Sequence, residues 1–253
     1  MKKHRGLLIA TISLTVLFAI ALSFRVPQRV YGRFFQKPDS GPLCTYELKN
    51  FKFHYQKETA TPSIVMFGNS LIDYGDWKTI LGREDVINRG IAGDQTYCMC
   101  ERLQYLTSLN AKIWFIEGGI NNIGMSPEGI LGNYAEIVQF VKNENAVPVI
   151  NLVLHIGKNA GNKFTAFKDY ETVNSRVDAL NKLLTGYAQE NGINIIDLNP
   201  LLTDKEGLLK DEFTTDGVHL TDKAYKLWGN EIDKLLESHN IQQPSQRAIS
   251  SNN

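Results

Sequence analysis

Residues 64–77, IVMFGNSLIDYGDW, run from four apolar residues directly into a glycine, an asparagine and a serine. A short apolar run of this kind is typical of a strand that is buried on both faces, as in a parallel sheet. Its polar end then lies at the carboxyl end of the strand, where open parallel sheets gather their functional groups. This stretch therefore predicts a fold class and the first place to look for a site.

The same pattern recurs along the chain. Apolar runs at SIVMF, DVIN, KIWFIE, VPVINLVL and INIID alternate with stretches of helical periodicity. The clearest helices cover residues 169–192, which end at Gly192, and 220–238, with Thr221 as the N-cap. Strands joined by helices pair in parallel with right-handed crossovers, so we expect an α/β fold with helices on both faces of one sheet.

The charge balance excludes one class of partner. The chain has 253 residues, with 27 basic and 27 acidic side chains and a net charge of +0. Proteins that bind nucleic acids usually present a field of positive charge. We therefore expect no nucleic-acid partner.

The amino-terminal region has a different composition. Residues 6–24, GLLIATISLTVLFAIALSF, are almost unbroken apolar sequence behind the basic MKKHR. This length favours an uncleaved membrane anchor over a removed signal peptide, although Ala21-Leu22-Ser23 would fit a cleavage site. We predict an anchor or signal peptide at 1–24, a linker and short element at 25–60, the main domain at 61–238 and a disordered tail at 239–253.

We therefore expect the domain to lie on the periplasmic or extracellular side, membrane-anchored rather than secreted. An exported chain can form disulfides. The three cysteines are Cys44, Cys98 and Cys100, and their spacing matches no zinc site. We interpret them as small buried residues, with a bridge to Cys44 as the lesser alternative.

Four polar motifs follow predicted strands or lie in loops near their carboxyl ends: Gly68-Asn69-Ser70, the loop around Gly93, Gly119-Ile120-Asn121-Asn122 and Asp216-Gly217-Val218-His219. A serine hydroxyl becomes a nucleophile only beside a base that a third group orients. His219 and Asp216 can supply that pair for Ser70. The N–H groups of Ser70 and Gly93 and the amide of Asn121 can stabilise an oxyanion.

These motifs resemble the four blocks of the SGNH, or GDSL, hydrolases, over roughly residues 63–237. The resemblance implies a flavodoxin-like three-layer α/β/α sandwich with five parallel strands in the order 2-1-3-4-5. It also implies Ser70, Asp216 and His219 as the catalytic triad, and Ser70, Gly93 and Asn121 as the oxyanion hole. The family pattern has aspartate where this chain has Asn69 and Asn122, a departure that concerns the tuning of the site and not its existence.

Other residues near strand ends are candidates for lining the substrate crevice, namely Asn69, Asn122, His155 and Trp77. Asp73 and Asp76 lack a third hard ligand at a clear spacing, so we predict no metal site, and no cofactor is implied. The resemblance implies a serine esterase acting on an acyl or O-acetyl ester, which we expect to be a small-molecule or glycan ester. The alternatives are a lysophospholipase or long-chain acyl esterase, an acyltransferase on the same serine, and a non-catalytic glycan- or lipid-binding domain.

Overall fold

The computed structural model describes residue 44 and residues 62–243. The predicted anchor, almost all of the predicted linker and residues 244–253 of the predicted tail lie outside the described residues. In the part of the chain that is described, no helix has both the length and the apolar character needed to cross a membrane.

The core of the domain is a five-stranded sheet in the order β2-β1-β3-β4-β5, and every pair of neighbouring strands is parallel. The prediction of an α/β fold with this strand order is confirmed. The strands are β1 (Ile64–Gly68), β2 (Val86–Gly90), β3 (Ile113–Glu117), β4 (Val147–Asn151) and β5 (Asn194–Ile196).

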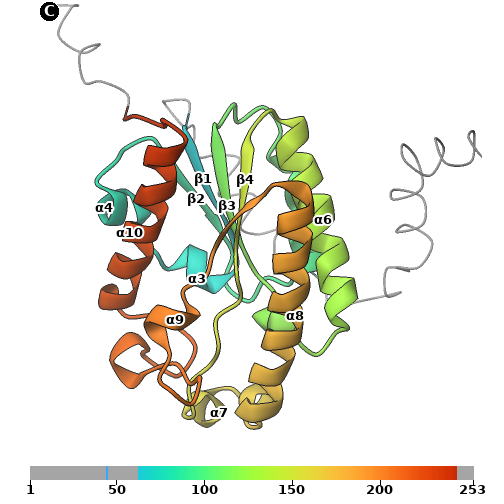
Figure 1. Ribbon diagram of the computed structural model, residues 1–253, viewed down its shortest axis with the longest axis vertical. Coiled ribbons are helices and arrows are strands. Elements are labelled where there is room, and N and C mark those ends of the chain that lie inside the picture. Colours follow the sequence, from blue (N-terminus) through green and yellow to red (C-terminus); the bar gives the residue numbers. More distant parts are fainter. Residues whose placement is uncertain (1–43, 45–61, 244–253) are drawn as a thin grey trace, which may run out of the picture. The chain divides into compact units, whose positions relative to one another are not determined.

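Helices cover both faces of this sheet (Figure 1). On one face lie α4 (Trp77–Leu81) and α10 (Asp222–Ser238), and on the other lie α6 (Pro127–Asn143) and α8 (Tyr170–Asn191). Each face has its own hydrophobic core, built around Trp77 and Trp228 on the first face and around Trp114 and Tyr134 on the second. Two buried faces explain why the strands are continuous apolar runs.

The ends of the two long helices follow largely from the sequence. Asp169 caps α8 by accepting a hydrogen bond from Thr172 N at 3.1 Å, and Gly192 ends it in the left-handed conformation. Thr221 precedes α10 as expected, but its hydroxyl donates to Glu212 O at 3.1 Å instead of capping the helix.

Strand β4 is shorter than its apolar run. Beyond Asn151, Leu152 N still donates to Ile196 O, but Val153 is paired with a side chain. Asn181 of α8 accepts from Val153 N at 2.9 Å and donates to Val153 O at 2.8 Å. Asn199 Nδ2 also donates to Val153 O at 3.1 Å, so side-chain amides bind the backbone of Val153 where regular strand pairing has ended.

Shorter elements fill the connections. They are α3 (Ser70–Asp73), α5 (Thr96–Glu101), η1 (Arg102–Tyr105), η2 (Ile120–Asn122), α7 (Ala160–Lys163), η3 (Thr165–Phe167), α9 (Asn199–Leu202) and η4 (Asp211–Phe213). In Figure 1, α3, α7 and α9 lie at the same edge of the sheet, where the strands end.

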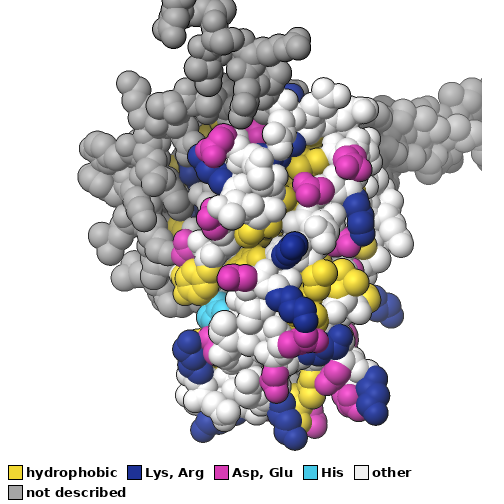
Figure 2. Space-filling view, turned by 90° about the vertical axis from the view of Figure 1, so that its left-hand side faces the viewer, with side chains coloured by type: hydrophobic (Ala, Val, Ile, Leu, Met, Phe, Trp, Pro, Cys, Tyr) yellow, Lys and Arg dark blue, Asp and Glu magenta, His cyan; other side chains and the backbone are white. Residues whose placement is uncertain are grey.

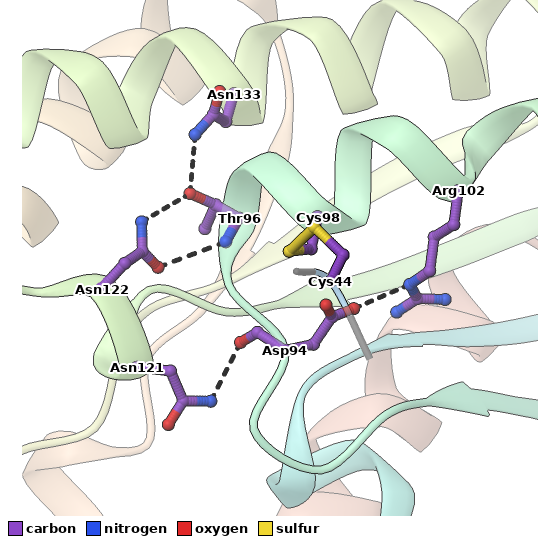
Figure 3. Close-up of a disulfide and its surroundings, with 8 residues drawn as sticks. All are labelled: Cys44, Asp94, Thr96, Cys98, Arg102, Asn121, Asn122 and Asn133. Atoms are coloured by element: carbon purple, nitrogen blue, oxygen red, sulfur yellow. Dashed lines mark hydrogen bonds and ion pairs between the residues drawn. A yellow bond between two sulfur atoms is a disulfide. The ribbon is translucent and has the colours of Figure 1, made fainter. Parts of the chain in front are cut away.

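A disulfide joins Cys44 to Cys98 in α5, which corrects our preferred interpretation of three unbridged cysteines. Figure 3 shows the bridge beside Asp94 and Thr96. Cys100 is buried and forms no disulfide within the described residues, and its thiol donates to Asn133 O at 3.4 Å. The lesser alternative is therefore the one that the structure contains, and the spacing of the cysteines alone did not favour it.

Candidate active site

Ser70 is the first residue of α3, directly after β1. Asn69 caps this short helix, because its Oδ1 accepts a hydrogen bond from Leu71 N at 2.8 Å. Gly68 must be a glycine here, since a Cβ at that position would lie 2.2 Å from Glu117 O. The close approach of β1 to β3 thus fixes where the serine leaves the sheet.

His219 connects Ser70 to Asp216. Its Nε2 lies 3.0 Å from Ser70 Oγ, and its Nδ1 lies 2.9 Å from Asp216 Oδ2. The other carboxylate oxygen of Asp216 accepts from the backbone N–H groups of Val218 and His219, at 3.1 and 2.8 Å. The aspartate therefore holds both the ring and the backbone of the histidine, in the arrangement that activates a serine.

A lysine that the sequence did not suggest also contacts this aspartate. Lys163 at the end of α7 donates to Asp216 Oδ2 at 2.7 Å, although its own side chain is 62% exposed. Burial raises the pKa of Asp216, but the hydrogen bonds from His219 and Lys163 outweigh this effect and hold the pKa well below its usual range. Asp216 is therefore ionised at neutral pH and can stabilise a charged His219.

The expected oxyanion donors come from two adjoining loops. Gly93 is exposed and has a φ of 80°, a conformation that favours glycine. Asn121 Nδ2 donates to Asp94 O at 2.9 Å, as Figure 3 shows. An amide carries two N–H bonds, so the second remains available, because it makes no hydrogen bond within the described residues. This contact joins the loops that carry Gly93 and Asn121.

A buried ion pair anchors the Gly93 loop to the nucleophile strand. Arg102 is fully buried, and its Nε donates to Asp94 Oδ2 at 2.7 Å. The same guanidinium donates to Arg89 O at 2.9 Å and to Gly68 O at 3.0 Å. Removing it would leave a buried carboxylate and two carbonyls without this donor, which is costly.

The two asparagines that replace the family's aspartates are buried, which corrects their assignment to the substrate crevice. Asn122 accepts from Thr96 N at 3.2 Å and donates to Thr96 Oγ1 at 2.9 Å, so it holds the first turn of α5 (Figure 3). Asn69 is 0% exposed, and its amide faces the buried carboxyl of Glu117. Asn69 thus holds the start of α3, and Asn122 holds the start of α5.

Glu117 is a second feature that sequence reasoning missed. It ends β3 in register with Gly68 and is 1% exposed. Burial raises its pKa to about 8, even though the amide of Asn69 stabilises the charged form. Neither carboxyl oxygen has a partner at regular hydrogen-bond geometry within the described residues. At neutral pH this group is therefore largely uncharged, beside Gly68 and Asn69, the two residues that precede the serine.

Trp77 and His155 also lie elsewhere than expected. Trp77 is 2% exposed and packs edge-on against Tyr225 and Trp228, so it belongs to the core. His155 is half-buried between Gly207 O, 2.7 Å from its Nδ1, and Asp178 Oδ1, 2.8 Å from its Nε2. Both ring nitrogens thus have partners, and the ring joins α8 to the loop that carries Gly207.

The carboxylates near the serine have other partners. Asp73 Oδ2 accepts from Ala92 N at 2.9 Å, and Asp76 caps α4. Among the described residues, no group of three or more histidine, cysteine, aspartate or glutamate side chains could hold a metal ion.

Two aromatic rings pack against His219. The ring centroid of Tyr74 lies 5.0 Å from that of His219, and the centroid of Phe164 lies 5.6 Å away. Tyr74 lies four residues after Ser70, on the same helical turn, which is the one sequence signal that could have placed it in the site. Phe164 gave no such signal.

Comparison with known proteins agrees with this geometry. Residues 66–227, more than half of the chain, match the GDSL-like lipase/acylhydrolase family. The chain belongs to this family. Its two departures from the family pattern, Asn69 and Asn122, therefore lie within a recognisable member, and the structure gives each of them a supporting role.

Among curated proteins, the chain is similar to the N-acylneuraminate cytidylyltransferase of Streptococcus agalactiae serotype III, with 29% identity over 177 residues. The match covers 66% of this chain but only 40% of that protein, so the chain spans less than half the length of this relative. The match by itself therefore does not show that this chain has the activity of the whole relative.

Solved structures show the same fold. A GDSL-like lipase from Bacteroides thetaiotaomicron superposes with a TM-score of 0.63 and 20% identity, covering 77% of this chain and 96% of that one. An acetyl xylan esterase superposes with a TM-score of 0.54 and 19% identity, covering 68% and 98%. At such identities these structures are evidence for the fold alone.

Proposed function

We propose that the protein is a serine esterase that hydrolyses an acyl or O-acetyl ester of a carbohydrate through an acyl-enzyme. The observation that carries this proposal is the continuous contact from Ser70 Oγ to His219 Nε2, at 3.0 Å, and from His219 Nδ1 to Asp216, at 2.9 Å. Nucleophile, base and orienting carboxylate are all within hydrogen-bond reach.

In the first half of the reaction, Ser70 Oγ attacks the ester carbonyl carbon while its proton passes to His219 Nε2. The carbonyl oxygen becomes an oxyanion, which the N–H groups of Ser70 and Gly93 and the free N–H of Asn121 stabilise. The C–O bond to the alcohol then breaks, and His219 gives its proton to the leaving oxygen. The alcohol departs and the acyl group stays on Ser70.

In the second half, water attacks the acyl-enzyme and His219 takes the proton of that water. Collapse of the second tetrahedral intermediate breaks the bond to Ser70 Oγ, which recovers a proton from His219. The products are a carboxylic acid and the free enzyme. Asp216 stays ionised throughout and stabilises the imidazolium in both halves.

The carbohydrate part of the proposal is supported by the similar proteins. A curated relative is named for an acylated sugar, N-acylneuraminate, and one neighbour in fold is named as an acetyl xylan esterase. Family membership by itself gives only an acylhydrolase. The two names share an acylated sugar, and an ester of such a sugar is the form that a serine acylhydrolase would cleave.

The test compares esters that differ in one part only. The purified protein is assayed on 4-nitrophenyl acetate, 4-nitrophenyl palmitate, acetylated xylooligosaccharide and an O-acetylated N-acylneuraminate. We expect release of acetate from a sugar ester to have the highest kcat/KM. A strong preference for palmitate would point to lipid substrates, and acyl transfer that requires an added sugar acceptor would point to a transferase.

Ser70→Ala is expected to lower kcat/KM by roughly 10⁴-fold, because the other triad members cannot act without the nucleophile. A fluorophosphonate probe should label the wild type and not this variant. The control is Ser238→Ala, a serine at the exposed end of α10, which should behave as wild type. Full activity in a correctly folded Ser70→Ala protein would overturn the proposed function.

We further propose that the domain acts outside the cytoplasm, held by an uncleaved anchor at residues 1–24. The apolar run behind basic residues supports export, and a disulfide between Cys44 and Cys98 is usual in oxidising compartments. Fractionation of cells that express the whole chain tests this. We expect recovery with membranes and digestion by protease that is added outside the cytoplasmic membrane, whereas recovery in the cytoplasmic fraction would contradict the proposal.

A further inference from the structure

We propose that Tyr74 and Phe164 form a subsite that holds the alcohol part of the ester, a sugar ring, beside His219. This inference rests on the proposed function, because it concerns the substrate of the same site. It assigns a binding role to an aromatic pair that the motifs of the family do not include.

The first argument is exposure. Tyr74 is 57% exposed, which makes it the most exposed large hydrophobic side chain of the described residues. By contrast, Trp77, which comes three residues after Tyr74, is 2% exposed, and Tyr225 of α10, which packs against Trp77, is 6% exposed. On the face drawn in Figure 2, hydrophobic side chains lie beside a histidine that reaches the surface. An exposed ring that touches a catalytic base has a surface free to contact a ligand.

The second argument is position. Tyr74 N donates to Ser70 O at 3.0 Å, so its ring leaves the same helical turn as the nucleophile. Phe164 comes from the loop after α7 and packs on His219 at an interplanar angle of 72°, while Tyr74 packs at 48°. The imidazole thus has an aromatic neighbour from each of two separate segments of the chain.

The third argument is the direction of the reaction. The oxygen of the reacting carbonyl must turn toward the donors of Gly93 and Asn121. The oxygen of the leaving alcohol must instead come within hydrogen-bond reach of His219 Nε2 in order to receive its proton. Groups packed against His219 therefore meet the alcohol part of the ester, and not its acyl part.

The chemistry of these side chains then selects the class of alcohol. A pyranose ring presents a face of C–H groups, and an aromatic ring supplies a flat apolar surface with a negative π-face for it. Lys163 Nζ lies 5.4 Å from the centre of the Phe164 ring and is bonded to Asp216, so this end of the subsite is polar. An apolar surface edged by polar groups fits a sugar better than a hydrocarbon chain.

The experiment measures how well each variant distinguishes two acetate esters. One is acetylated xylooligosaccharide and the other is ethyl acetate, which has the same acyl group and almost no alcohol part. For Tyr74→Leu, which retains an apolar contact with His219, we expect the ratio of the two kcat/KM values to fall about tenfold, mainly through KM for the sugar ester. Tyr74→Phe should keep the wild-type ratio, because the ring face is retained.

Two controls separate binding from general damage. Tyr105→Ala removes a tyrosine that is 45% exposed in η1, outside the site, and should leave the ratio unchanged. Binding of acetylated xylooligosaccharide is also measured in the Ser70→Ala background, where no turnover occurs. In that background Tyr74→Leu should raise the dissociation constant for acetylated xylooligosaccharide by a similar factor.

A Tyr74→Leu variant that loses activity equally on both esters would overturn the inference, because the ring would then only position His219. An unchanged ratio would overturn it too, and so would a selective loss on 4-nitrophenyl palmitate. Failure of the proposed function looks different. In that case Ser70 would not react with the fluorophosphonate probe, or the wild type would favour no sugar ester in the first place.

Discussion

At the scale of single residues, the uncharged carboxyl of Glu117 explains a departure from the family pattern. An aspartate at position 69 would place a second carboxyl group against a carboxyl that is already buried, whereas the amide of Asn69 can face it without adding charge. Asn69 still accepts from Leu71 N, so the capping role of the position is preserved.

The raised pKa of Glu117 makes a prediction about stability. The folded protein binds this proton up to about pH 8, while the unfolded chain releases it near the ordinary value of 4.5. Between these values the folded state binds more protons, so the free energy of unfolding falls as pH rises, by at most about 1.4 kcal/mol per pH unit from this group. The loss begins near pH 4.5 and is complete above pH 8.

Glu117→Gln has nearly the same shape and does not titrate. Its stability relative to wild type should therefore increase from pH 5 to pH 9, as measured by urea denaturation of both proteins at each pH. All other titrating groups are common to the two proteins and cancel in the difference. Two pH profiles that run parallel would show that Glu117 does not change its charge on unfolding in this range.

At the scale of elements, the packing of the loop that carries Asp216 and His219 against α7 depends on one glycine. Gly217 has a φ of 86°, and a Cβ there would lie 2.4 Å from Ala160 N at the start of α7. Gly157 N also donates to Gly217 O at 2.7 Å. The loop that carries Asp216 and His219 is thus pressed against the segment that carries Lys163.

Gly217→Ala is therefore expected to destabilise the protein by about 1–3 kcal/mol and to lower kcat/KM at least roughly tenfold, because the loop must move away from α7. The matched control is Gly186→Ala in the interior of α8, where a new Cβ meets no atom within 4 Å. That change should stabilise the protein by about 0.5–1 kcal/mol. Similar melting temperatures for the two variants would contradict this account.

Elements were also where the sequence was most informative. The apolar runs predicted all five strands, and Gly192 ends α8 as predicted. Two of the motifs contain the residues that form the contact from Ser70 through His219 to Asp216, and the other two meet where Asn121 donates to Asp94 O. Strand ends in a parallel sheet meet at one edge, which is why the sequence pointed to these residues. The shortened β4 could not be foreseen, because a side chain of α8 replaces its partner.

Contacts between distant segments were not predictable either. Lys163, Phe164 and Glu117 gain their roles from packing of loops whose conformation no local pattern encodes. Trp77 and the buried asparagines were misplaced because proximity to Ser70 in the sequence does not tell which way a side chain points.

At the scale of the whole molecule, the disulfide ties α5 to a residue 54 positions earlier in the chain. Closing a loop of this length restricts the unfolded chain and stabilises the folded state by up to about 4 kcal/mol in the chain-entropy model. The helix that carries Cys98 begins at Thr96, three residues after Gly93, so the bridge is attached to the segment that follows one of the proposed oxyanion donors.

Cys44→Ser should therefore melt at a lower temperature than wild type, and addition of dithiothreitol should lower the melting temperature of wild type but not that of the variant. Cys100→Ser serves as the control, because Cys100 is outside the bridge, and it should retain the response to the reductant. Equal melting temperatures of wild type and Cys44→Ser in the absence of reductant would show that the bridge contributes nothing to stability.

The burial of all three tryptophans has a practical consequence for such measurements. Trp77, Trp114 and Trp228 are each at most 2% exposed. Trp77 of α4 and Trp228 of α10 belong to the core on one face of the sheet, and Trp114 of β3 belongs to the core on the other. Indole emission should thus be blue-shifted in the native protein and move to longer wavelength on unfolding. In Trp114→Phe the remaining tryptophan fluorescence comes from one side of the sheet only. Comparison of the fluorescence denaturation curves of this variant and the wild type would show whether both sides of the sheet unfold together.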